Sequence, residues 1–308
     1  ALSMANGVSI TPKHFFGVNH EIKNSLFLVD DQTIVYPAGH NIVSLKVNEE
    51  RAPQYFIPGN GVEVICNCLG AEMTEAITHV SISAKQNLIG ICERSVAGGK
   101  GLCRVFELIT QKEKAVLPDD DIEVADLSTE FVASAFNPKN ENWFATLCGS
   151  PDWQVLLWDW EKMRLLTKVA IGLQGPVTAK PCNFELSWNP FEHDATKGMI
   201  LVTGPQNTFK TCNFVHDDKG DHLTIGFSQI NAEESRKISP NYTCHGWGQQ
   251  NGYILVCTDN GEMIVCQNSG EFKAYVLDSP VGETIEALIA TENGFLVATE
   301  NAFRVFVN

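Results

Sequence analysis

The sequence has 308 residues, of which 44% are apolar and 19% are charged, and its formal net charge is −15. This length fits one or two domains, and the ordinary composition excludes a largely disordered chain. The acidic charge disfavours nucleic acids and anionic lipids as partners, because either would need a basic patch, and the sequence offers none. With no signal-peptide pattern in residues 1–15 and no apolar run of about 20 residues, we expect an intracellular, soluble protein.

Ten cysteines are spread along the chain. No two of them have the Cys-x-x-Cys spacing that metal sites and redox motifs use. Disulfide frameworks are typical of short secreted chains, and this chain is much longer. We therefore expect reduced thiols that pack inside strands as small apolar residues. The cysteines that lie in apolar runs are Cys92, Cys103, Cys148, Cys212, Cys257 and Cys266.

Short runs of β-forming residues dominate the sequence, and turn residues such as Gly, Asn, Asp and Pro separate them. No long stretch keeps the apolar spacing of a helix. The runs fall into six sets. The first three sets predict strands at 26–29, 34–36, 41–47 and 54–57; at 79–83, 88–93, 102–108 and 115–117; and at 131–136, 143–148, 153–159 and 165–169. The last three predict strands at 184–188, 199–203, 208–214 and 222–227; at 242–247, 253–257, 262–266 and 272–276; and at 285–289, 294–298 and 302–307.

Four antiparallel strands joined by tight turns are typical of one propeller blade, and repetition of such sets is typical of the whole fold. We therefore predict an all-β, WD40-like β-propeller of four-stranded antiparallel blades, with six repeats visible and seven possible. The propeller is expected to form a single domain over residues 1–308. Its blades are expected near 24–58, 77–118, 129–170, 182–227, 240–278 and 284–308.

The sixth set lacks a fourth strand, which would leave an open sheet edge that invites aggregation. Residues 13–18, which contain the run His14-Phe15-Phe16-Gly17-Val18, are the candidate for a strand that closes this blade. The alternative is that this segment packs across an outer face of the domain.

The dipeptide Trp158-Asp159 ends the third expected strand of the third set, the position at which WD repeats carry their name-giving residues. We expect Trp158 to pack between blades and Asp159 to help tie the loops of its blade. The predicted role is structural. The other sets carry different residues at this position, and the Gly-His element that opens many WD repeats is missing.

An acidic loop lies between the second and third sets. It comprises Asp119, Asp120, Asp121, Glu123 and Asp126. Its spacing lacks the glycine and the distant glutamate of an EF-hand calcium loop. We expect a solvated loop, with a docking patch for a basic partner as the alternative.

No motif in the sequence predicts catalysis, a cofactor or a bound metal. The Gly-rich run at residues 97–101 lacks the full phosphate-loop pattern. The eight histidines have no zinc spacing, and no serine stands in a nucleophile elbow. A propeller hydrolase would need two convergent carboxylates, and no pair stands out. We predict a protein that is not an enzyme.

Loops displayed by rigid blades are the usual sites of partner contacts. We expect protein partners to bind one loop face, built from hairpin turns between the second and third strands of the blades. The candidate contact residues are Asp152, Trp153, Gln206, Asn207, Asp259 and Asn260. Each of these residues could also serve only its own turn.

The order of several short segments resembles the family of cilia- and flagella-associated protein 57, an axonemal WD-repeat protein. Each segment is short, and their shared order makes the resemblance specific. The 59–76 insertion and the acidic loop depart from it. The segments that carry the resemblance are 14–18, 31–39, 56–59, 158–162, 209–210, 241–247 and 258–261, with Asn24 between the first two.

The resemblance implies a non-enzymatic scaffold of motile cilia and flagella that serves inner dynein arm assembly or regulation. It implies dynein-arm or regulatory-complex proteins as partners, and a location on the axoneme, or in the cytoplasm before assembly. Family chains resemble two propellers followed by a coiled coil, so this chain would be a truncated part of a longer protein. The alternative is a general WD40 module that recognises peptides or proteins in an intracellular complex.

Overall fold

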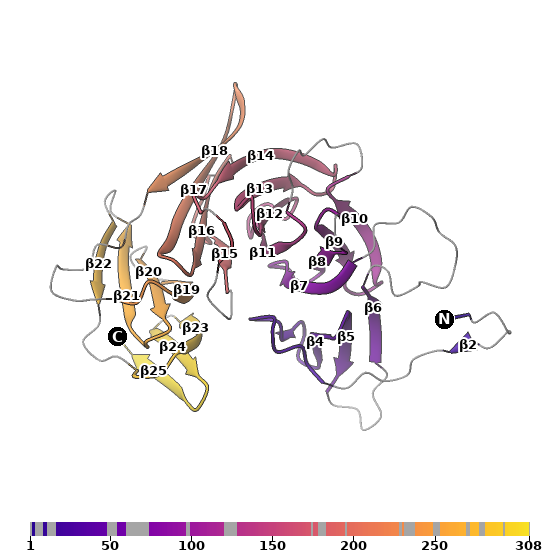
Figure 1. Ribbon diagram of the computed structural model, residues 1–308, viewed down its shortest axis with the longest axis horizontal. Coiled ribbons are helices and arrows are strands. Elements are labelled where there is room, and N and C mark those ends of the chain that lie inside the picture. Colours follow the sequence, from indigo (N-terminus) through magenta and orange to yellow (C-terminus); the bar gives the residue numbers. More distant parts are fainter. Residues whose placement is uncertain are drawn as a thin grey trace. The chain divides into compact units, whose positions relative to one another are not determined.

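The computed structural model forms two compact units, Ala1–Lys168 and Val169–Asn308, whose chain order Figure 1 traces in colour. Every regular element that it describes is a β-strand, so the prediction of an all-β chain is confirmed. The described residues are 2–3, 9–10, 17–47, 54–59, 74–96, 99–119, 128–173, 175–177, 183–194, 196–227, 230, 238–248, 253–268, 272–276, 281–291 and 293–307.

The first unit contains three four-stranded sheets in which strands that are neighbours in sequence also pair in space. Two short strands, β1 (Leu2–Ser3) and β2 (Ser9–Ile10), pair with each other. The sheets are β3 (Phe27–Leu28), β4 (Thr33–Ala38), β5 (Asn41–Lys46) and β6 (Gln54–Pro58); β7 (Thr74–Ile82), β8 (Leu88–Ser95), β9 (Leu102–Glu107) and β10 (Lys112–Leu117); and β11 (Phe131–Phe136), β12 (Trp143–Cys148), β13 (Gln154–Asp159) and β14 (Arg164–Ala170).

The second unit contains two four-stranded sheets and one three-stranded sheet with the same simple order. The sheets are β15 (Glu185–Trp188), β16 (Lys197–Gly204), β17 (Thr208–Asp217) and β18 (Gly220–Phe227); β19 (Tyr242–Trp247), β20 (Tyr253–Thr258), β21 (Met263–Asn268) and β22 (Phe272–Val276); and β23 (Ile285–Thr291), β24 (Gly294–Thr299) and β25 (Phe303–Val307). These antiparallel blades confirm the predicted β-propeller class.

Several strands extend beyond the runs that the sequence predicted. The strand expected at 115–117 begins at Lys112 in the structure, and the one expected at 79–83 begins at Thr74. Lys112, Glu113 and Lys114 are exposed on β10. An apolar pattern marks only the part of a strand that faces the core, whereas ladder hydrogen bonds with the neighbouring strand extend it further.

Apolar clusters fill the spaces between successive sheets of a unit. Alternate residues of β8 serve two clusters: Ile89 and Ile91 pack against the first sheet, and Leu88 and Cys92 pack against the third. Because both faces of the strand are buried, it reads in sequence as a nearly continuous apolar run. In the second unit, Tyr242 lies in a cluster that the sheets of β15–β18 and β19–β22 share.

The described cysteines are free, buried and held in these clusters: Cys92, Cys103, Cys148, Cys212, Cys244, Cys257 and Cys266. Burial raises the pKa of the Cys148, Cys212 and Cys266 thiols to about 12. Since the thiolate is the reactive form, we expect these seven thiols to resist a disulfide-exchange reagent at pH 8 until denaturant is added. Rapid labelling of more than three of the ten cysteines in the native chain would contradict this packing.

Candidate functional site

The hairpin between β16 and β17 presents two exposed amide side chains on a fixed backbone. Gln206 and Asn207 both have a φ of +57°, the left-handed conformation that two-residue hairpin turns require and that asparagine tolerates. The amide N–H of Asn207 donates to the carbonyl of Pro240 at 2.6 Å, which ties this hairpin to the segment that leads into β19. Both candidate residues therefore lie where a partner could reach them.

The hairpin between β20 and β21 holds Asp259 at the centre of a polar network. The Asp259 carboxylate accepts a hydrogen bond from the Asn241 amide at 2.9 Å and another from the Ser239 hydroxyl. The Thr284 hydroxyl donates to the Asp259 carbonyl at 2.7 Å. Asp259 therefore fixes the loops around it, and its neighbour Asn260 is exposed.

Gly261 completes this hairpin because only glycine fits there. Its φ is +81°, and a Cβ at this position would lie 2.5 Å from the Glu283 carbonyl oxygen. The Gly261 carbonyl accepts a hydrogen bond from the Val281 amide at 3.0 Å. Together, the connected loops at residues 205–207, 238–241, 259–261 and 281–284 form what we call the second-unit rim.

In the first unit, the hairpin between β12 and β13 has a similar tie. The Ser128 hydroxyl donates to the Gly149 carbonyl at 2.5 Å and lies 3.5 Å from the Asp152 carboxylate. The Trp153 side chain turns inward, at a φ of +45°, and is only 2% exposed. Trp153 is therefore removed from the candidate contacts, because its indole packs into the protein. Asp152 is half-buried beside it.

The WD dipeptide takes part in packing and turn formation. Trp158 is 0% exposed, and its indole N–H donates to the Thr146 hydroxyl on the neighbouring strand at 3.0 Å. It lies in the cluster that the sheets of β7–β10 and β11–β14 share. Asp159 accepts hydrogen bonds from the backbone N–H and the ammonium group of Lys162, at 3.3 and 2.7 Å.

Some predicted features lie outside the described residues. In the acidic loop, Asp119 is described and half-buried, whereas Asp120, Asp121, Glu123 and Asp126 lie outside that part of the chain. Of the candidate closing strand at 13–18, only Gly17 and Val18 are described, and they belong to no strand. The acidic docking patch and the closing strand remain predictions.

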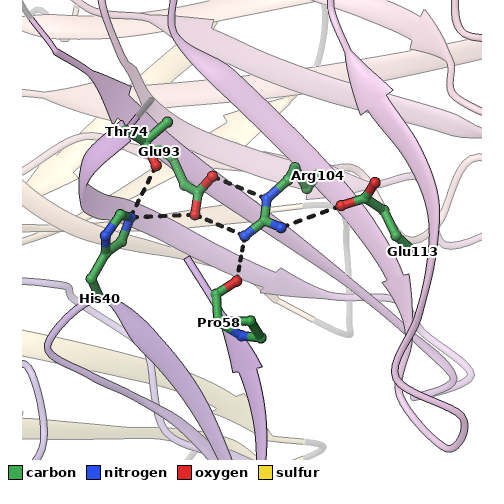
Figure 2. A network of polar contacts seen from close by, with 6 residues as sticks. All are labelled: His40, Pro58, Thr74, Glu93, Arg104 and Glu113. Carbon is green, nitrogen blue, oxygen red and sulfur yellow. Dashed lines mark hydrogen bonds and ion pairs between the residues drawn. The ribbon is translucent and has the colours of Figure 1, made fainter. Parts of the chain in front are cut away.

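A buried charge network that the sequence did not single out joins the first two sheets of the first unit (Figure 2). Glu93 on β8 is 0% exposed, and both its carboxylate oxygens lie 3.0 Å from the Arg104 guanidinium on β9. Arg104 also donates to the Pro58 carbonyl of β6 at 2.7 Å and contacts Glu113 at 3.2 Å. The sequence did contain a signal for this pair, because Glu93 and Arg104 are opposite charges within two apolar runs that were predicted to pair as a hairpin.

His40, in the hairpin between β4 and β5, completes this network. Its Nε2 lies 3.0 Å from the Thr74 hydroxyl and 3.5 Å from the Glu93 carboxylate. Gly59 makes this position possible, because a Cβ there would lie 2.2 Å from the imidazole ring. The network thus links the first sheet to the second through the His40–Thr74 and Arg104–Pro58 contacts.

Two other histidines are held in polar contacts inside the sheets. His79 Nδ1 lies 3.1 Å from the Ser134 hydroxyl, and burial lowers the pKa of His79 to about 4. His245 lies between the Thr203 and Ser187 hydroxyls, at 2.7 and 2.5 Å. Burial also lowers the pKa of His245, against a smaller opposite effect of Glu185. Both imidazoles are neutral at pH 7.

Because of these two buried histidines, we expect the free energy of unfolding to depend on pH. His79 binds a proton below about pH 6.5 in the unfolded chain, whereas in the folded chain it does so only near pH 4. The contribution of the neutral, buried histidine to the free energy of unfolding is therefore complete above pH 6.5. It is lost as the pH falls, by up to about 1.4 kcal/mol per pH unit for each such histidine. We expect the unfolding midpoint in urea to fall between pH 6.5 and 4. His79→Asn should flatten this slope, and an unchanged slope would contradict the assignment.

Among the described residues, no helix is long and apolar enough to cross a membrane. Within the same residues, no group of three or more His, Cys, Asp or Glu side chains is arranged to hold a metal ion.

Comparison with known proteins shows which proteins are similar to the chain in sequence and which solved structure is similar in fold. No protein-family model matches it. Cilia- and flagella-associated protein 57 of Mus musculus is 24% identical over 80% of the chain. The proteins named 57 C and 57 A of Tetrahymena thermophila are 27% identical over 62% and 25% identical over 96% of the chain. The chain spans only 17%, 13% and 24% of the lengths of these three relatives.

Among solved structures, the β-propeller domain of Cps50 (Swd1) from Myceliophteria thermophila matches the chain with a TM-score of 0.51. It is 14% identical, and the match covers 75% of this chain and 65% of that domain. This likeness concerns the fold. Taken together with the sheets and the collinear relatives, it identifies the chain as a WD-repeat-type β-propeller that resembles cilia- and flagella-associated protein 57.

Proposed function

We propose that the chain is a non-enzymatic, protein-binding scaffold of motile cilia and flagella. The observation that carries the ciliary part is the likeness to three proteins named as cilia- and flagella-associated, one of them over 96% of the chain. On this proposal the protein resides on the axoneme as part of the cytoskeleton, and in the cytoplasm before assembly. Its partners are components of the inner dynein arms or of neighbouring regulatory complexes, and its role is their assembly or regulation.

The geometry of the second-unit rim supports a binding role. Gln206, Asn207 and Asn260 expose neutral polar groups, while hydrogen bonds from neighbouring loops hold the backbone beneath them. Groups fixed before binding lose little conformational entropy when a partner arrives. The Asp259 carboxylate is used within the rim, so we assign it to loop organisation. We assign no catalytic residue.

The binding role can be tested on axonemes isolated from motile cilia and stripped of peripheral proteins with high salt. We expect the purified chain to co-sediment with them. Gln206→Arg should weaken this binding about tenfold if the rim forms the contact. Asn213→Arg is the matched control, because it changes another exposed amide of the same unit, on β17.

Equal axonemal binding by the two variants would show that the contact lies outside the second-unit rim. Absence of binding by the unaltered chain would favour the general WD40 recognition module, which needs no axonemal partner.

A further inference from the structure

A cavity of about 640 Å³ opens between the first two sheets of the first unit. The ends of β5 and β6 and the turns before β4, β8 and β10 surround it. These turns lie at the opposite ends of the strands from the β4–β5 hairpin that carries His40. The volume falls in the range of ordinary ligand sites, and the buried charge network is not part of the lining.

Apolar side chains are unusually exposed around this cavity. Ile109, in the turn before β10, is 87% exposed, and Tyr55 on β6 is 49% exposed. Both line the cavity. A solvent-facing group of large apolar side chains beside a concave surface is typical of a protein-interaction site.

The polar lining differs in charge from the rest of the chain. The whole chain carries a net charge of −15, whereas the lining holds two lysines, Lys46 and Lys85, and one carboxylate. That carboxylate belongs to Asp30 and accepts hydrogen bonds from the backbone N–H groups of Gln32 and Thr33, both at 2.7 Å. Because Lys85 is paired with Glu141 at 2.9 Å, Lys46 is the lining cation to which a negative group of a partner would be drawn.

The side-chain amides of Gln86, Asn87 and Gln111 also line the cavity. Asn87 Oδ1 accepts from the Ser83 hydroxyl at 2.8 Å, and Gln86 Nε2 donates to the Leu28 carbonyl at 3.4 Å. The remaining donors and acceptors of the three amides suit the alternating N–H and C=O groups of an extended peptide backbone. We propose that this cavity docks an extended peptide segment of a protein partner, which packs an apolar side chain against Tyr55 and Ile109 and places an acidic side chain beside Lys46. The proposal rests on the protein-binding role given above and assigns it one site.

The test uses a library of random short peptides displayed on phage and selected on the 308-residue chain. The enriched peptides are then synthesised with a fluorescent label, and their affinities are measured by anisotropy. We expect sequences that combine an apolar residue with Asp or Glu. Ile109→Asp should weaken their binding at least about tenfold, because it removes an apolar contact and adds a like charge. Val96→Asp is the matched control, since Val96 is an exposed residue of the β8–β9 hairpin.

Lys46→Glu separates the ionic contact from the apolar one. It should weaken acidic peptides by severalfold and leave versions with Ala in place of the acidic residue unchanged. The proposal is overturned if no peptide is enriched, if enriched peptides bind Ile109→Asp as tightly as the unaltered chain, or if basic peptides are preferred. The ciliary role does not depend on this result: axonemal binding without peptide binding removes only this site, and peptide binding without axonemal binding removes only the ciliary role.

Discussion

Replacement of Arg104 by methionine is expected to lower the free energy of unfolding by about 3–5 kcal/mol, the usual cost of breaking a buried ion pair. The variant would leave the Glu93 carboxylate, which is 0% exposed, without the two guanidinium contacts at 3.0 Å. It would also remove the donor to the Pro58 carbonyl, which links the first sheet to the second. His40 Nε2 would still lie 3.5 Å from the carboxylate, but this one contact does not replace two hydrogen bonds at 3.0 Å. Urea unfolding followed by tryptophan fluorescence measures the loss.

Two further variants show whether burial is the cause. Arg94→Met breaks an ion pair with Glu130 at 2.7 Å, but the Arg94 side chain is 45% exposed. This change should therefore cost less than about 1 kcal/mol. The double variant Glu93→Leu with Arg104→Met replaces both charges of the buried pair, so no unpaired charge stays buried. It should recover most of the lost stability. Equal losses for Arg94→Met and Arg104→Met would contradict the buried network.

Trp158→Ala is expected to destabilise the chain by about 3–5 kcal/mol, because it opens a large cavity in a close-packed cluster. Trp158 is 0% exposed between the second and third sheets of the first unit. Its loss would also leave the buried Thr146 hydroxyl without the indole donor at 3.0 Å. Thermal or urea unfolding, followed by far-UV circular dichroism, gives the change in stability.

Thr146→Val tests the hydrogen bond without opening a cavity. It should cost about 1–3 kcal/mol, because the buried indole N–H loses its acceptor while the volume is kept. Trp143→Ala is the control for tryptophan removal, since Trp143 on the neighbouring strand β12 is only half-buried. A loss for Trp143→Ala as large as that for Trp158→Ala would show that Trp158 does not anchor the cluster.

The buried strands could be predicted from the sequence because a strand that packs against neighbours on its faces needs apolar residues there. The run from Phe131 to Phe136 is apolar because β11 packs on both faces. The exposed start of β10, at Lys112 to Lys114, was missed because its charged residues contribute pairing with β9 and no burial. Sheet hydrogen bonds carry no residue signature of their own.

The candidate contacts could be predicted only in part. Turn chemistry located Asn207 and Asn260 correctly in hairpins, since these positions demand particular residue types. The burial of Trp153 depends on a backbone φ of +45°, and the sequence gives no sign of it. The contact between Glu93 and Arg104 depends on strand register, which only the folded sheet reveals.

The most direct test of the proposed scaffold uses the full-length protein that contains this chain, tagged in a ciliated cell. Cilia are isolated, and membrane and soluble matrix are removed with detergent. The proposal predicts that the tag stays with the axoneme and that high salt releases part of it. Release of all the tag by detergent alone, or its absence from cilia, would contradict the axonemal role.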